Sequence, residues 1–198
     1  MAVELKECLK VLRLPTVRDC YEDMAETARM ESHSYEQYLT EVLEREREER
    51  RRNRIERLLR ISKLPLEKNL ESFDRKRLTA KVDAQLSVML EGGFLDRKEN
   101  VLAFGNPGSG KTHLLCAIGQ EMIYQDRRVL FRHCDLLVQE LLFAKDQLTL
   151  APLLKKLSRY EALIIDDIGY VQQSREEMEV LFTLLAHRYE RGSVMLTS

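Results

Sequence analysis

The sequence predicts an α/β protein with a parallel sheet and a helical N-terminal extension. Four short apolar runs recur in the second half of the chain, at residues 101–104, 128–131, 162–166 and 193–197. Helical patterns that start near Thr112, Asp135 and Ser174 separate these runs, and strands alternating with helices are typical of a parallel sheet. The runs are apolar throughout rather than alternating, which indicates a sheet covered on both faces.

The part of the chain before about residue 98 is predicted to be helical. Pro15 separates two short helical patterns. Ser34 and Gln37 form a capping-box pattern, and the helix that follows is expected to continue to Ser62. A last helix is expected over residues 77–90, with a stop at Gly92 and Gly93. The apolar residues that define the helical stripes are Leu5, Leu9, Leu12, Val17, Tyr21, Met24, Ala28, Tyr35, Tyr38, Leu39, Val42 and Leu43.

Composition excludes several classes of protein. The 198 residues fit one to two domains, and a hydrophobic share of 44% supplies a core. Lys and Arg number 32 against 33 Asp and Glu, so the charges balance to −1. The sequence shows no long apolar run for a membrane helix and no apolar secretory signal. Its four cysteines form no CxxC pair, which argues against a zinc site or a disulfide framework. The chain is therefore expected to be soluble and cytoplasmic.

Residues 105–112, GNPGSGKT, match the complete phosphate-loop pattern GxxxxGK[ST]. The loop follows an apolar run and opens a helix, which is the context that the pattern requires. Its glycines let backbone N–H groups point at phosphates, and the helix adds its positive N-terminal end. Lys111 is expected to reach the β- and γ-phosphates of ATP, and the hydroxyl of Thr112 to hold Mg²⁺. The expected nucleotide-binding residues are Gly105, Asn106, Pro107, Gly108, Ser109, Gly110, Lys111, Thr112 and His113.

Asp166 and Asp167 close the apolar run 162–166. Ligands of α/β proteins bind outside the carboxyl ends of the strands, so this acidic pair is expected to meet the phosphates. Asp166 is expected to bind Mg²⁺, directly or through water, and Asp167 to orient or deprotonate the attacking water. The alternative is a solvated acidic pair at a strand end. A further strand intervenes between the two motifs, which suggests the additional-strand group of ATPases.

Four segments together resemble the IstB-like ATPases, the transposition helper proteins of bacterial insertion sequences and relatives of DnaC-type helicase loaders. The segments are FGNPGSGKTHLL, LIIDDIGY, LLAHRYERGSVMLTS and LPLEKNLESFD. The resemblance implies an AAA+ module, an ATP-dependent homo-oligomer on double-stranded DNA, and a partner transposase. It also implies that Asp166 is the magnesium residue, that Asp167 activates water, and that the stretch Leu70–Asp74 lies where the adenine base is held. Residues 1–68 are then expected to be a helical region that binds DNA or a partner, and residues 69–198 the AAA+ ATPase core.

Two departures from the family pattern affect what is expected of catalysis. Many AAA+ members have Glu where this chain has Asp167, and the chain stops at Ser198, before the expected sensor, lid and arginine finger. An arginine finger raises the rate of hydrolysis by orders of magnitude, so ATP binding is a safer expectation than efficient turnover. Two alternative functions stay open: a DnaC-like replicative helicase loader, and a truncated nucleotide-binding module without efficient turnover.

A basic stretch precedes the phosphate loop. Residues 50–63 contain seven basic side chains and one acid, Glu56. Such a helix can follow a DNA backbone without reading bases, although the acids at 41–49 also allow a merely solvated, internally paired surface. The expected DNA contacts are Arg50, Arg51, Arg52, Arg54 and Arg57.

Other candidate residues give weaker signals. His113 either approaches the nucleotide or faces a strand or solvent. For His133 and Cys134 a loop role is favoured over metal binding. Tyr170 either faces DNA or packs internally, and the tyrosines at 21, 35 and 38 indicate core or partner-facing packing rather than base stacking.

Overall fold

The computed structural model describes residues 2–169 and 174–198, so Tyr170 lies outside the described residues. Contacts between Cα atoms divide the chain into two compact units, residues 1–56 and 57–198. This division falls earlier than the boundary expected between residues 68 and 69, and the assignment of functions to the two parts stays a prediction. Within the described residues no helix is both long and apolar enough to cross a membrane.

The first unit contains helices α1 (Ala2–Val11), α2 (Pro15–Met30) and most of α3 (Tyr35–Ser62). The capping box that was expected at the start of α3 is confirmed. The backbone N–H of Ser34 donates to Gln37 Oε1 at 2.7 Å, and the N–H of Gln37 donates to Ser34 Oγ at 3.2 Å. Leu9, Val17 and Val42 form a buried cluster in this unit, and Leu14, Tyr21, Met24 and Tyr38 pack against them.

Only part of the apolar pattern of this unit is buried. Tyr38 and Val42 pack inward from α3, as expected, but Tyr35 is 93% exposed and Leu39 is 56% exposed. Adjacent helical residues lie about 100° apart around the helix axis. When Tyr38 and Val42 face the core, the residues beside them on α3 therefore face solvent. Tyr35, Leu39 and Leu43, like Leu5 and Leu12, are therefore exposed parts of the predicted apolar stripes, and for Tyr35 the partner-facing alternative stays a prediction.

The second unit is built on a parallel sheet. Its strands are β1 (Val101–Ala103), β2 (Val129–His133), β3 (Ala162–Asp166) and β4 (Ser193–Thr197), which confirms the four expected runs. Its helices are a 3₁₀ turn (Arg75–Arg77), α4 (Ala80–Leu90), α5 (Gly93–Asp96), α6 (Lys111–Tyr124), α7 (Cys134–Asp146), α8 (Leu150–Leu157) and α9 (Arg175–Arg188). Helix α8 was not among the helices predicted from the sequence.

The order of strands in the sheet is β1-β4-β3-β2, with every neighbouring pair parallel. The last strand of the chain, β4, therefore lies between the strand that leads into the phosphate loop and the strand that ends in Asp166. A strand is thus added between these two strands of the sheet, as in the additional-strand group that the sequence suggested, but the added strand is β4. The strand that intervenes along the chain, β2, instead lies at the outer edge.

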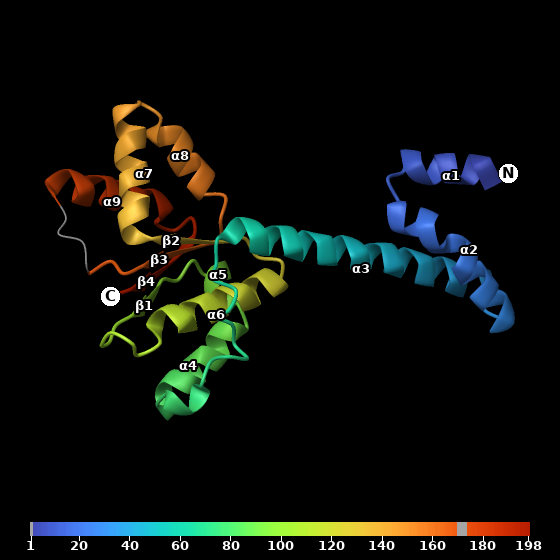
Figure 1. The fold of residues 1–198 in the computed structure, drawn as a ribbon, viewed down its shortest axis with the longest axis horizontal. Helices are drawn as coiled ribbons and strands as arrows, with labels where there is room; N and C mark the ends of the chain where they lie inside the picture. The colour runs from blue at the N-terminus through green and yellow to red at the C-terminus, as the bar shows by residue number, and fades with distance from the viewer. Residues whose placement is uncertain (1, 170–173) are drawn as a thin grey trace. The chain divides into compact units, whose positions relative to one another are not determined.

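Helices cover both faces of the sheet, as its apolar strands predicted. Helices α7, α8 and α9 lie on one face, and α6 lies with α4 on the other (Figure 1). Leu163, Ile165 and Val194 of the sheet form a buried cluster with Leu137 and Leu141 of α7. Because both faces are covered, the accessible part of the strands for chemistry is the edge where their carboxyl ends meet.

Arg188, at the end of α9, is a charged side chain within the core of this unit. It is 1% exposed, and its guanidinium donates to the carbonyl oxygens of Leu157 at 2.9 Å, Tyr160 at 3.0 Å and Ser193 at 2.9 Å. A further bond of 3.3 Å reaches the carbonyl of Glu161. Burial lowers the pKa of Arg188 to about 10, so the side chain remains charged at neutral pH. It joins α9, α8 and the starts of β3 and β4.

Candidate functional site

The phosphate loop joins β1 to α6. Gly108 and Gly110 have φ angles of 74° and 92°, in the left-handed region that residues with a Cβ rarely adopt. Gly110 immediately precedes α6, and no side chain caps this end of the helix. Its first backbone N–H groups are therefore oriented to receive an anion. The ammonium of Lys111 donates to the carbonyl oxygens of Gly105 at 2.7 Å and Asn106 at 3.0 Å, so it lies against the loop.

Asp166 and Thr112 come together at this edge of the sheet. Asp166 ends β3 and is only 2% exposed. Thr112, in the first turn of α6, donates its hydroxyl to Asp166 Oδ1 at 2.8 Å. The structure thus pairs two residues that lie 54 positions apart in the chain and that the sequence selected for Mg²⁺. A carboxylate and a hydroxyl are oxygen donors of the kind that Mg²⁺ takes, so these two residues fit the ion.

Thr197 was not selected from the sequence, yet it holds both aspartates. Its hydroxyl donates to Asp166 Oδ1 at 2.6 Å and accepts the backbone N–H of Asp167 at 2.8 Å. Thr197 is fully buried at the end of β4, whereas Asp167 is exposed and has a φ of 60°. The run SVMLT ends on this polar residue, and the carboxyl ends of parallel strands lie at one edge of the sheet. The sequence therefore contained the information that places Thr197 near the two aspartates.

His133 also lies at this edge. It ends β2 in register with Asp166, and its Nδ1 is 3.7 Å from Asp166 Oδ2. Ligand atoms of His133, Asp166 and Asp167 all lie within 4.8 Å of one another. The favoured loop role was wrong for His133, because β2 extends to residue 133 rather than ending at 131, and Cys134 is a buried residue of α7.

An apolar cavity of about 250 Å³ lies beside the phosphate loop. Ser109, Gly110 and Lys111 line it on the loop side, and Phe73 lines it from the stretch expected to hold the base. The remaining walls come from Leu78, Val82, Gln85, Leu86, Met89, Val101, Leu102, Ala103, Phe104, Leu114, Leu115 and Ile118. Apolar walls next to a phosphate site suit a flat ring such as a nucleobase.

The imidazole of His113 is directed at the loop segment before α4. Its Nε2 lies 2.9 Å from the carbonyl oxygen of Asn69 and 3.2 Å from Ser72 Oγ, and its ring meets the ring of Phe73 edge-on at 5.1 Å. A carbonyl oxygen only accepts hydrogen bonds, so Nε2 carries the hydrogen. His113 is not among the residues that line the cavity beside the phosphate loop.

Within the first unit, Arg50 connects α3 to the loop between α1 and α2. Its guanidinium contacts Glu46 Oε1 at 2.7 Å and the carbonyl of Arg13. Glu46 is buried and accepts the N–H groups of Thr16 and Val17, in the first turn of α2. Burial alone raises the pKa of Glu46, but the hydrogen bonds from Arg50, Val17 and Thr16 outweigh it, so the pKa lies below its ordinary value.

The other arginines selected for DNA contact are exposed on α3. Arg52 forms an ion pair with Glu49, with 2.7 Å between its Nη2 and Glu49 Oε1. Arg51 and Arg54 follow in the same unit, and Arg57 begins the next. Part of this basic surface is thus paired within the helix, as the solvated alternative expected, and its role in DNA binding stays a prediction.

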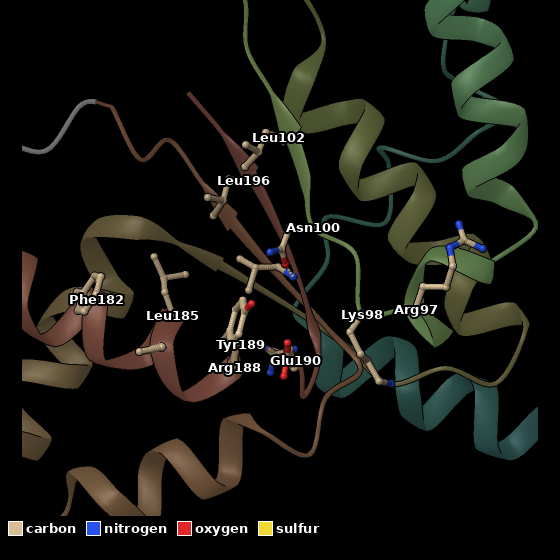
Figure 2. A pocket seen from close by; sticks show the side chains of 13 residues that line it. Arg97, Lys98, Asn100, Leu102, Phe182, Leu185, Arg188, Tyr189, Glu190 and Leu196 are labelled. Carbon is tan, nitrogen blue, oxygen red and sulfur yellow. Dashed lines mark hydrogen bonds between the residues drawn. The ribbon is translucent and has the colours of Figure 1, made fainter.

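A larger cavity than the one beside the phosphate loop lies between the sheet and α9. Its volume is about 700 Å³, and Leu102 and Leu196 of the sheet face Phe182 and Leu185 of α9 across it, with Tyr189 nearby (Figure 2). No residue of the phosphate loop lines it. Size alone therefore does not locate the chemistry, whereas the convergence of loop, carboxylates and hydroxyls does.

Comparisons with known proteins identify a family of ATP-binding proteins. Residues 7–198 match the model of a family described as IstB-like ATP-binding proteins. An insertion-sequence ATP-binding protein of Sinorhizobium fredii is 40% identical over 96% of this chain, and one named for IS21 in Pseudomonas aeruginosa is 36% identical over 98%. The chain spans 64% of the Sinorhizobium relative, less than two thirds of its length, and 74% of the Pseudomonas relative.

Two solved structures share the fold over part of this chain. The crystal structure of the DnaC helicase loader aligns with a TM-score of 0.59 and 20% identity, over 66% of this chain and 76% of that one. AMPPCP-bound DnaA from Aquifex aeolicus aligns with a TM-score of 0.58 and 20% identity, over 69% of this chain and 43% of that one. The fold is thus that of the AAA+ P-loop proteins, as the sequence predicted.

Proposed function

Since this chain belongs to the family of IstB-like ATP-binding proteins, we propose that it is an Mg²⁺-dependent ATPase that assembles on DNA and assists a transposase. The observation that carries the ATPase proposal is the 2.8 Å contact between Thr112 and Asp166 beside the phosphate loop. Loop, hydroxyl and carboxylate stand together where the triphosphate of ATP would be held.

Each residue of the site has a distinct role in this proposal. Thr112 and Asp166 hold Mg²⁺, which neutralises phosphate charge when bound. The N-terminal end of α6 receives phosphate oxygens, and Lys111 exchanges its contacts with the loop carbonyls for contacts with the β- and γ-phosphates. Asp167 is exposed next to this group and orients or deprotonates the attacking water.

The cavity beside the phosphate loop is the proposed site of the adenine base. It is lined by Phe73 and by Gly110 of the phosphate loop, so a base bound there remains within reach of the triphosphate site. Its walls are largely apolar, and the removal of a flat ring from water there favours binding.

The proposed DNA contacts are the exposed arginines of α3. Relatives at 36–40% identity are named for insertion sequences, and one structural neighbour is a DnaA bound to AMPPCP and single-stranded DNA. Arginines contact DNA mainly at phosphates, so such binding requires no base sequence. We further propose that ATP promotes a homo-oligomer on duplex DNA and that hydrolysis releases it.

The test is ATP turnover by this chain with and without long duplex DNA, beside Lys111→Ala. DNA-stimulated turnover that is lost in the variant supports the proposal. Turnover that Lys111→Ala leaves unchanged contradicts it, since the phosphate loop would then not be the site. Tight ATP binding without turnover would instead support a nucleotide-binding module.

The DNA and partner parts of the proposal need their own measurements. The affinity for duplex DNA should fall steeply as salt increases, with a slope of about −0.9 per phosphate contacted, and a flat response would contradict backbone binding. A pull-down with ATP is expected to recover a transposase rather than a replicative helicase. Recovery of the helicase alone would favour a helicase loader.

A further inference from the structure

Helix α6 begins at the phosphate loop, and it also holds the segment 64–73 along its side. Gln120, 3% exposed, donates to the carbonyl oxygens of Pro65 at 3.3 Å and Lys68 at 3.0 Å. Leu64 packs closely at Gly119, where a Cβ would lie 3.4 Å from both of its methyl carbons. The start of the segment is therefore fixed to the middle of α6.

His113 fixes the end of the same segment. It lies seven residues before Gln120, which is two helical turns along the same face. Its Nε2–H donates to the carbonyl of Asn69, and Ser72 Oγ is 3.2 Å from the same nitrogen. The hydroxyl of Ser72 is also within hydrogen-bond distance of the carbonyl oxygens of Glu67, at 2.9 Å, and Asn69, at 3.2 Å. The backbone N–H of Ser72 donates to Asn69 Oδ1 at 2.8 Å. The turn is therefore held from within by Ser72 and Asn69, and the imidazole of His113 fixes it to α6.

The ring of Phe73 connects this turn to the phosphate loop. It contacts the ring of His113 at 5.1 Å, and its Cε2 is 3.5 Å from where a Cβ on Gly110 would lie. Phe73 also lines the cavity proposed for the base. His113 directly follows Thr112, so consecutive residues of α6 face the carboxylate of Asp166 and the segment that carries Phe73.

We propose that His113 is a positioning residue for the nucleobase: it holds Phe73 against the phosphate loop so that the base-binding wall is formed before ATP arrives. The inference rests on the proposed function and assigns His113 an indirect role, without contact to the nucleotide. Without its contacts, the segment populates other arrangements, and the apparent affinity falls by the fraction of molecules that stay competent.

The expected effect is specific to ligands that have a base. One hydrogen bond and one aromatic edge contact each correspond to about a threefold to tenfold change in an equilibrium. His113→Ala should therefore weaken ATP binding by about tenfold or more. Inorganic tripolyphosphate carries the same phosphates without the base, so its affinity should change by less than about twofold.

The experiment is calorimetric titration of the full chain with ATP and with tripolyphosphate, both with Mg²⁺. The variants are His113→Ala and His113→Gln, which retains a nitrogen donor at the same distance along the side chain but removes the ring. His187→Gln on α9 is the matched control, because it makes the same chemical change at a half-buried histidine outside the site. The expected order of ATP affinity is wild type and His187→Gln, then His113→Gln, then His113→Ala.

Two results would overturn the inference. Equal losses for ATP and tripolyphosphate would show that His113 supports the phosphate loop itself, and unchanged ATP affinity would show that the turn needs no imidazole. If His113→Ala does not fold, His113→Gln decides by the same comparison of the two ligands. Failure of the proposed function is distinguishable, since the wild-type chain would then bind neither ligand and Lys111→Ala would change nothing.

Discussion

Thr197→Val tests whether the buried hydroxyl at the end of β4 organises the two aspartates. Valine has nearly the shape of threonine, so the change removes a polar group without opening a cavity. It removes the 2.6 Å bond to Asp166 and the 2.8 Å bond from the N–H of Asp167. A bond to a charged group contributes about 1.5–3 kcal/mol and a neutral one about 1 kcal/mol. The free energy of unfolding should therefore fall by about 2–4 kcal/mol.

The same change should weaken the proposed Mg²⁺ site. Asp166 keeps its bond from Thr112, but it loses the second hydroxyl that donates to the same oxygen, Oδ1, and helps to fix its orientation. Loss of a partner that orients a metal ligand typically costs about 10–100-fold in metal affinity or activity. The Mg²⁺ concentration that half-saturates ATP binding should rise accordingly, while Thr197→Ser, which keeps the hydroxyl, should stay close to wild type.

Urea unfolding gives the stability of each variant, and fluorescent ATP binding at graded Mg²⁺ gives the metal requirement. The reasoning would be refuted if Thr197→Val and Thr197→Ser behaved alike in both measurements. A stability loss with an unchanged Mg²⁺ requirement would restrict Thr197 to a structural role.

Three further predictions concern packing within each of the two units. The pKa of Glu46 is lowered on folding, so the stability that its carboxylate contributes is present above its unfolded pKa of about 4.3 and is lost as pH falls through the lower folded pKa. In Glu46→Gln, the loss of stability with falling pH below about pH 4.5 should therefore be smaller, as measured by acid unfolding followed by circular dichroism. An unchanged profile would contradict this. Gly119→Val should lower the free energy of unfolding by about 1–3 kcal/mol in urea, because a Cβ would already lie 2.8 Å from Ile164 Cδ1, and equal or greater stability would contradict the close contact of α6 with β3. Arg188→Met should cost at least about 3 kcal/mol by the same assay, since four carbonyl contacts lose a charged donor, and a loss below about 1 kcal/mol would show that water or backbone shifts replace it.

The pattern of residues alone predicted most of the nucleotide-binding half. The phosphate loop is a contiguous motif, so Gly105 to Thr112 could be recognised without tertiary information. The apolar run before Asp166 predicted a strand of a parallel sheet. The capping box at Ser34 is equally local, because its donors and acceptors lie within four residues.

Other features depend on contacts between distant parts of the chain. Sequence periodicity could not tell which of Tyr35, Tyr38 and Leu39 packs inward, because all lie within one broad stripe and only the position of α2 selects among them. It likewise could not show that His113 faces Asn69, since a helical residue's partner is set by the segment that packs on that face.

The amino-acid sequence by itself determined the phosphate loop, the acidic strand end and the family, because these are encoded in neighbouring residues. Only the tertiary structure decided that β4 inserts between β1 and β3. That insertion brings Thr197 between Asp166 and Asp167, and β2 brings His133 to the same edge. The physical reason is that strand order arises from long-range pairing of backbone groups, and any apolar strand can satisfy such pairing, so the order is not written in any local pattern.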